Sequence, residues 1–219
     1  MNTLRSHTGR VSFRPLAVAA AVTAAVTGLC VPMMVQAQSV ENPWQVRVRA
    51  VNIDSANKDS TGYGLSINKK TIPEFDVSYF FTPNIAAELI LTYPQKHKLY
   101  SEGTQIGTLK HLPPTLTVQY HFNPTGTVRP YVGAGLNYTR FSGVHFDSAV
   151  QQSLKPSIKN NSFGAAAQAG VDVMLDKAWS INFDIKKVQI GTKVSSAGTE
   201  VGKFKVNPLL VGVGVGYRF

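Results

Sequence analysis

Eight segments of this chain alternate between apolar and polar residues with a period of two. They cover residues 44–50, 74–81, 85–92, 115–122, 132–138, 163–173, 179–186 and 211–219. A period of two sends successive side chains to opposite faces of a β-strand. In each segment one face is apolar, with aromatic residues near its ends, and the other is polar, charged or glycine. The pattern therefore predicts eight strands, each close to the length of about 9–11 residues that a tilted membrane-spanning strand needs.

The connections between these segments alternate in length. Residues 82–84, 123–127 and 176–178 form short links, whereas residues 54–70, 93–110, 140–161 and 188–203 form long ones. This alternation is typical of an all-β fold, an eight-stranded antiparallel transmembrane β-barrel with short periplasmic turns and long extracellular loops. The alternative is a secreted sandwich or lipocalin-like barrel with its apolar face inside, and that fold gives no reason for the alternation of loop lengths.

The N-terminal segment has the pattern of a secretory signal peptide. Residues 1–15 carry three arginines and no acid, residues 16–31 are small and apolar, and a small-residue exit ends at Ala37. We expect cleavage after Ala37, which leaves residues 38–219 as the barrel. An uncleaved membrane anchor is the alternative. A lipid anchor on Cys30, the single cysteine, is disfavoured because Leu29 precedes it where a small residue is expected.

Composition and charge support the same interpretation. The 219 residues are 43% hydrophobic but only 16% charged, and the net charge is +10. Half of each lipid-facing strand cannot carry charge cheaply, which explains the low charged fraction. The basic excess outside the signal peptide lies largely in the predicted loops, where it suits anionic lipopolysaccharide. An exported chain of this kind is not expected to bind nucleic acid, and its expected location is the outer membrane of a Gram-negative bacterium.

The final strand ends in aromatic residues at alternate positions, Tyr217 and Phe219. Outer-membrane barrels characteristically end in such a strand, which the barrel-assembly machinery reads. We therefore expect Tyr217 and Phe219 to act as an assembly signal.

The inward face of the predicted barrel carries many charges. The set expected to form a salt-bridged plug is Arg47, Arg49, Glu74, Asp76, Asp172, Asp184 and Arg218. An eight-stranded barrel has room for little beyond its own side chains, and unpaired buried charges cost several kcal/mol. A plug towards the periplasmic end is therefore expected rather than an open pore. An ion-selective filter is the alternative.

Two sequence motifs resemble a known family. The stretches His111-Leu112-Pro113-Pro114-Thr115-Leu116 and, at residues 129–139, RPYVGAGLNYT are similar to the OmpW family of small outer-membrane barrels, and the resemblance extends in order over the predicted mature chain. It implies an eight-stranded barrel with a narrow, largely apolar route. It also implies passive uptake of small hydrophobic molecules, which leave sideways through the wall into the membrane.

A sideways exit needs a break in strand pairing. Pro113 and Pro114 have no N–H to donate, and Pro73 removes another donor if it lies on the neighbouring strand. The alternative is that these prolines only bend an outer strand.

The resemblance also implies an apolar constriction across the lumen. Ile90 matches one side of it, but Lys186 stands where an aromatic residue can occur. Lys186 is expected to pair with Glu88 or Asp184, so that these residues line the channel.

The histidines and serines form no recognisable catalytic set, and no Gly-x-Ser-x-Gly motif occurs. We expect no enzyme activity, no metal site and no cofactor. The competing function is a non-transporting surface barrel that acts in adhesion, stress protection or phage and toxin reception.

Overall fold

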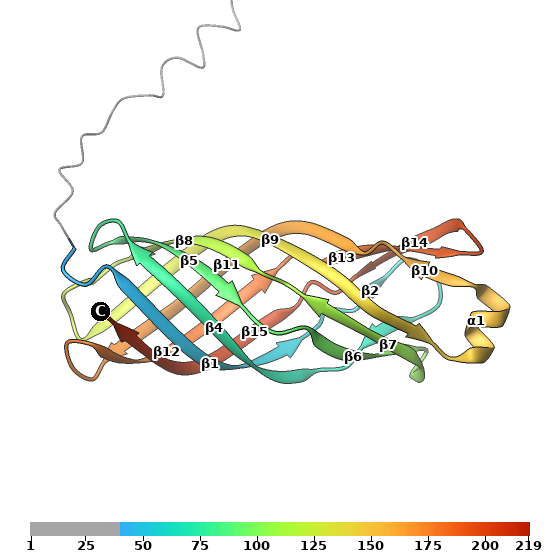
Figure 1. Ribbon diagram of the computed structural model, residues 1–219, viewed down its shortest axis with the longest axis horizontal. Helices are drawn as coiled ribbons and strands as arrows, with labels where there is room; N and C mark the ends of the chain where they lie inside the picture. Colours follow the sequence, from blue (N-terminus) through green and yellow to red (C-terminus); the bar gives the residue numbers. More distant parts are fainter. Residues whose placement is uncertain (1–39) are drawn as a thin grey trace, which may run out of the picture. The chain divides into compact units, whose positions relative to one another are not determined.

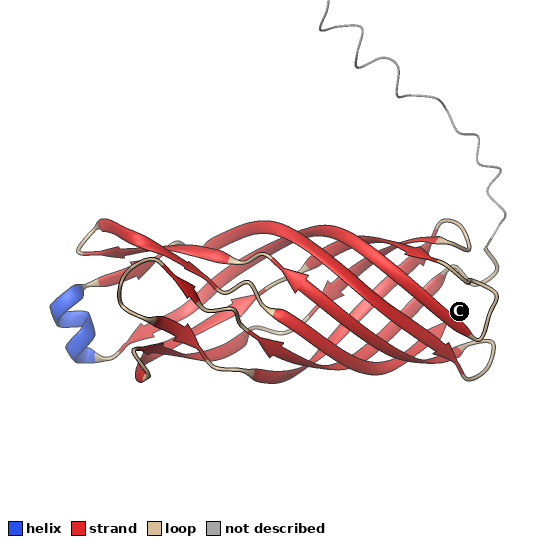
Figure 2. Cartoon of the chain, turned by 180° about the vertical axis from the view of Figure 1, so that it is seen from behind, coloured by secondary structure: helices blue, strands red, loops and turns tan. Residues whose placement is uncertain are grey.

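The computed structural model describes residues 40–219, which form one β-barrel (Figures 1 and 2). The predicted signal peptide, residues 1–37, and its cleavage site lie outside the described residues. Within residues 40–219, no helix is long and apolar enough to cross a membrane.

Eight strands close the barrel, as the alternation predicts. They are β1 (Trp44–Asp54), β4 (Lys70–Phe80), β5 (Ile85–Leu91), β8 (Thr115–His121), β9 (Val128–Phe146), β11 (Asn161–Met174), β12 (Trp179–Val188) and β15 (Leu209–Arg218). Each pairs antiparallel with its neighbours in chain order, and β1 pairs with β15 to close the cylinder. The predicted fold class is confirmed.

The two faces of the wall have opposite character. On β8, Leu116 and Val118 are 54% and 59% exposed, whereas the alternate residues Thr117 and Gln119 are almost completely buried. A water-filled surrounding would favour the reverse arrangement, with apolar side chains inside. An apolar outer wall around a polar interior is the arrangement that a lipid bilayer selects.

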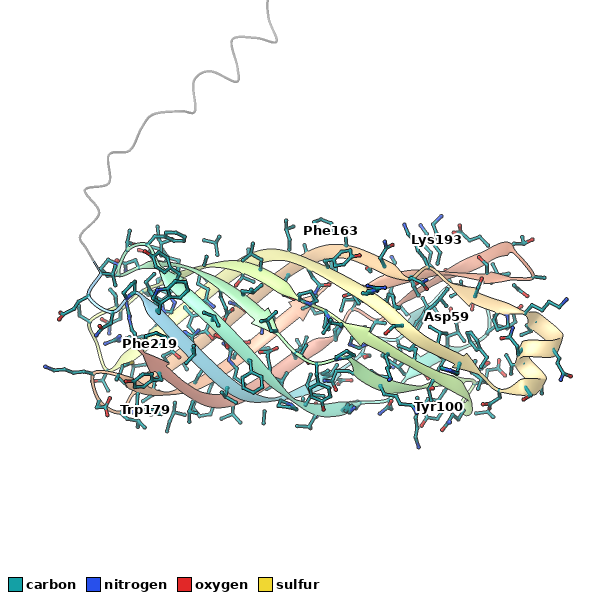
Figure 3. All side chains as sticks on the ribbon, viewed as in Figure 1. Asp59, Tyr100, Phe163, Trp179, Lys193 and Phe219 are labelled. Atoms are coloured by element: carbon teal, nitrogen blue, oxygen red, sulfur yellow. The ribbon has the colours of Figure 1, made fainter. Side chains whose placement is uncertain are left out.

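Short turns join the strands at the end where the chain terminates. At one of them the Asp176 carboxylate accepts hydrogen bonds of 2.7 Å from the backbone N–H groups of Ala178 and Trp179. Exposed aromatic rings lie on the outer wall at this end of the barrel, and Figure 3 shows Trp179 and Phe219 there. They form the girdle that such barrels place at a membrane interface.

The segments predicted as long loops are mostly strands. They contain β2 (Lys58–Asp59), β3 (Leu65–Ile67), β6 (Gln95–Ser101), β7 (Thr104–Leu112), α1 (Ser148–Leu154), β10 (Pro156–Ile158), β13 (Gly191–Ser196) and β14 (Thr199–Lys205). The long strand β9 continues into the sheet β9-β7-β6-β3, and a second sheet has the order β10-β13-β14-β2. Together they extend the barrel beyond its apolar wall, with α1 at the end opposite to the C-terminus (Figure 1).

Candidate functional site

Charged side chains from five strands fill the lumen at mid-barrel. Arg47 binds Asp172 through two contacts of 2.7 and 3.2 Å, and it also reaches Asp76 at 3.2 Å and Glu88 at 3.4 Å. Arg49 lies 2.9 Å from Glu74 and 2.8 Å from both Asp76 and Glu88. Strand register explains this pairing, because Arg47 and Arg49 stand directly opposite Asp76 and Glu74 on β4.

The upper edge of this ion network is formed by Lys186. Its Nζ atom lies 3.0 Å from Glu74 and 3.6 Å from Asp184. Sequence reasoning expected Glu88 or Asp184 as its partner, and the structure gives it Asp184 together with Glu74. The charged side chains of the network are at most 4% exposed, so the lumen is filled at this level.

Neutral polar groups complete the network. The Glu88 carboxylate accepts hydrogen bonds from Gln168 at 2.7 Å and Thr117 at 3.2 Å. The Tyr131 hydroxyl donates to Asp184 at 2.8 Å. Gly170 makes room for that ring, because a Cβ at this position would overlap the Tyr131 hydroxyl. Tyr131 was not singled out from the sequence, although it is an inward aromatic residue followed on the same face by Gly133 and Gly135.

The structure brings together six of the seven residues predicted for the plug, along with Glu88 and Lys186. Arg218 lies apart from them. Its Nε donates to the Asn42 carbonyl at 2.9 Å, and its guanidinium lies 3.9 Å from the centre of the Phe80 ring.

A small chamber lies directly above the network. Its floor is Glu74 and Lys186, and its walls are apolar side chains. These are Ile53, Ile72, Ile90, Val188, Ile190 and Leu210. Ile90 is therefore in the wall of this lower chamber, where the resemblance placed an apolar constriction. Its neighbours Pro113, Thr92 and His111 form one side of the chamber.

Strand pairing is interrupted beside the lower chamber. The β4–β5 ladder ends at Phe75 and Leu91, and the β5–β8 ladder ends at Ile90 and Thr115. Pairing resumes only between β6 and β7, where Gln95 faces His111. Residues 92–94 and 113–114 lie between these ladders and belong to no strand.

Four prolines surround the interruption. Pro113 and Pro114 lie within it, Pro94 follows β5, and Pro73 lies on β4 beyond the last residue that pairs with β5. None has an N–H to donate, so the ladder cannot continue here. On the opposite side, Asn137 donates to the carbonyls of Pro113 and Pro114 at 3.2 and 3.1 Å, which keeps this segment attached to β9. Three of these prolines were predicted from the sequence; Pro94 and Asn137 were not, because recognising both requires the strand register.

A larger apolar chamber occupies the outer extension. Its lining includes Leu65, Leu99, Phe141, Phe146, Val194 and Phe204, from both sheets of the extension. The sequence does not predict this upper chamber, because the hydrophobic pattern indicates loops over these segments.

Two stacked histidines lie between the two chambers. The rings of His97 and His111 are 4.7 Å apart and nearly parallel, and Phe141 packs edge-on against His111. His111 borders the lower chamber and Phe141 the upper one. Burial, together with the charges of His97 and Lys70, lowers the pKa of His111 to about 3, so the ring is neutral at physiological pH.

These features define an outer-membrane β-barrel protein with a lumen filled at mid-height and an apolar interior above. Within residues 40–219, no cluster of His, Cys, Asp and Glu has an arrangement suited to a metal ion. The chain belongs to the OmpW family, whose model matches residues 34–219.

Similar proteins support this assignment. Outer-membrane protein y4mB of Sinorhizobium fredii is 42% identical over 81% of this chain and 80% of its own length. Outer membrane protein W of Vibrio cholerae is 35% identical over 76% of this chain and 82% of its own. The dibenzothiophene metabolism operon protein PahQ of Pseudomonas aeruginosa is 28% identical over 82% of this chain and 90% of its own. The crystal structure of OprG from Pseudomonas aeruginosa has the same fold, with a TM-score of 0.71, 24% identity, and coverage of 80% of this chain and 95% of that one.

Proposed function

We propose that this barrel is a passive route for small uncharged hydrophobic molecules, which enter the outer extension and leave sideways into the acyl layer of the outer membrane. The observation that carries the proposal is the arrangement of the interior. An apolar upper chamber lies next to a lower chamber that is closed below by charges and bordered by a break in strand pairing.

The energetics favour a sideways exit over delivery through the barrel. A hydrophobic solute that reached the ion network would have to displace paired charges, and separating a buried pair costs about 3–5 kcal/mol. Moving instead into hydrocarbon gains about 25 cal/mol per Å² of apolar surface. The relative PahQ is named as a protein of a dibenzothiophene metabolism operon, and dibenzothiophene is an uncharged aromatic compound of the proposed substrate class.

The test is uptake of dibenzothiophene by Gram-negative cells that lack their own OmpW-family barrel. We expect cells expressing this chain to accumulate the compound several times faster than cells with an empty vector. The Thr92→Trp variant should fall to the vector rate, because residue 92 borders the lower chamber and an indole there fills it. Thr71→Trp is the matched control, since Thr71 on β4 is exposed on the outer wall.

Heat-modifiable migration on gels establishes that each variant is a folded barrel. Equal uptake by folded wild-type protein and empty vector would overturn the proposed function. Uptake that survives Thr92→Trp would overturn the route through the lower chamber. If replacing the β6–β7 and β13–β14 hairpins abolished a surface phenotype while Thr92→Trp left it intact, the barrel would be a surface protein rather than a transporter.

A further inference from the structure

A concave basic surface lies on the outer wall of the extension, outside the solute route. Ten residues line this groove, four of them lysines and none of them acidic. The lysines are Lys159, Lys193, Lys203 and Lys205. We refer to this surface as the lysine groove.

The fold holds these like charges close together. Lys193 on β13 stands directly opposite Lys203 on β14, and the backbone N–H of Lys159 donates to the Lys193 carbonyl at 3.0 Å. On the other side of β14, Lys205 stands opposite Lys58 of β2. Like charges directly opposite one another destabilise a sheet, so this arrangement favours an anionic partner.

Internal ion pairing neutralises only one of the four lysines. Lys193 lies 2.7 Å from Glu200, and both side chains are about half exposed. Among residues 40–219, Lys159, Lys203 and Lys205 form no salt bridge. The polar groups between them are already used within the protein, since Thr192 donates to the Lys159 carbonyl and Ser162 accepts the N–H of Gly191. These bonds fix the backbone of the groove and leave the ammonium groups available.

The lower edge of the groove is aromatic. Tyr138 and Phe163 are direct partners on β9 and β11, both line the groove, and both rings face outward, Phe163 being 70% exposed. Figure 3 shows Phe163 and Lys193 projecting from the same side, with Lys193 farther from the C-terminal end. Below these rings the wall is apolar, and above them the outward residues include Arg140, Lys193 and Lys203. The groove therefore lies at the level where acyl chains meet charged headgroups.

We propose that the lysine groove binds a phosphate group of a phosphorylated glycolipid of the outer leaflet, the lipid A part of lipopolysaccharide, with an acyl chain against Phe163 and Tyr138. Lysine ammonium groups suit a phosphate that is approached from several sides, because each is a rotatable point charge on a flexible stem. The aromatic edge provides an apolar surface for an acyl chain, and a free phosphate ion would make no use of that surface. This site is distinct from the solute route, because its four lysines and its two aromatic rings face the outside of the barrel.

The experiment measures retained lipid by native mass spectrometry of the full barrel released from detergent micelles containing diphosphoryl lipid A. We expect wild-type protein to retain a lipid A molecule. The triple variant Lys159→Gln, Lys203→Gln, Lys205→Gln should lose about tenfold or more in occupancy, as expected when charge-assisted hydrogen bonds to a phosphate are removed. The control triple variant Lys96→Gln, Lys98→Gln, Lys110→Gln removes the same charge from exposed positions on β6 and β7 and should keep the lipid.

Two further arms identify the ligand chemistry. Dephosphorylated lipid A should bind weakly to wild-type protein, and inorganic phosphate should not displace diphosphoryl lipid A. Equal loss of lipid in both triple variants would overturn the site in favour of general attraction to a basic surface. Retention of dephosphorylated lipid A would overturn the role of the phosphate. Displacement by inorganic phosphate would show a phosphate site without lipid specificity.

Discussion

The ion network in the lumen has three cations and five carboxylates. Because cations are the scarcer partner, removing one of them should cost far more than neutralising one carboxylate. Arg47→Met removes contacts of 2.7, 3.2 and 3.4 Å to three carboxylates. Asp172 is then buried with no cation beside it, and Asp76 and Glu88 keep only Arg49, so we expect a cost of about 3–5 kcal/mol. Asp76→Asn keeps the shape and leaves three cations facing four carboxylates, so we expect a loss of only ~1 kcal/mol.

The assay is equilibrium unfolding by urea in lipid vesicles. Trp44 and Trp179, the two tryptophans of the chain, report it through their fluorescence, because both are exposed on the lipid-facing wall and enter water on unfolding. Lys187→Met is the control, since Lys187 follows Lys186 but points outward, and its substitution should change the free energy of unfolding by no more than about 0.5 kcal/mol. An Asp76→Asn variant as unstable as Arg47→Met would refute the charge-count argument and show that each pair contributes separately.

Three other predictions concern the extension and the chain end. Since the pKa of His111 in the folded protein is lowered to about 3, only the unfolded chain gains this proton as pH falls below about 6.5. His111 should therefore lower wild-type stability by ~2.5 kcal/mol between pH 7 and 4.5. His111→Phe should remove this contribution, so its stability should fall less steeply with pH in urea titrations, and His145→Phe, at an exposed position, should leave the slope unchanged. Partial burial raises the pKa of Asp59, but hydrogen bonds from backbone N–H groups within residues 61–65 outweigh this effect and lower the pKa. The ionised carboxylate therefore stabilises the loop at pH values above the ordinary pKa of an aspartate, and this stabilisation is lost as the pH falls through the lowered pKa. Asp59→Ala should speed amide hydrogen exchange in residues 61–65 at neutral pH, and unchanged exchange would count against this capping role. Phe219→Ala keeps the backbone pairing with β1 but removes a 51% exposed terminal ring, so we expect a smaller heat-modifiable fraction in membranes if Phe219 is an assembly signal.

The sequence was sufficient for the barrel and for most members of the ion network, and insufficient for the pairing within it. Alternation alone places Arg47, Glu74 and Asp184 on one face of their strands, and a narrow barrel then forces such charges together. Which charges meet depends on strand order around the cylinder. Lys186 and Glu74 are 112 positions apart and meet across the lumen. The residues close to Lys186 in the sequence therefore do not predict its contact with Glu74.

The outer extension was missed for a different physical reason. A period of two shows that residues alternate between faces, but the solvent decides which face is apolar. Along β9, Leu136 and Tyr138 are apolar and outward, whereas three residues later Phe141 is apolar and inward, with Arg140 taking the outward position between them. The strand does not end there; its surroundings change from lipid to water, and the preferred face changes with them.

The same reversal occurs elsewhere around the barrel. Outward Ile185 on β12 is followed by outward Lys187, and beyond it the apolar residues Val188 and Ile190 point inward. A search for apolar outward faces therefore stops at the membrane boundary and interprets the remainder as loop. The reversal itself marks that boundary, since basic residues become the outward residues where the apolar wall ends. It also explains why one chain has two kinds of interior, a charged one inside the lipid-facing wall and an apolar one inside the water-facing extension.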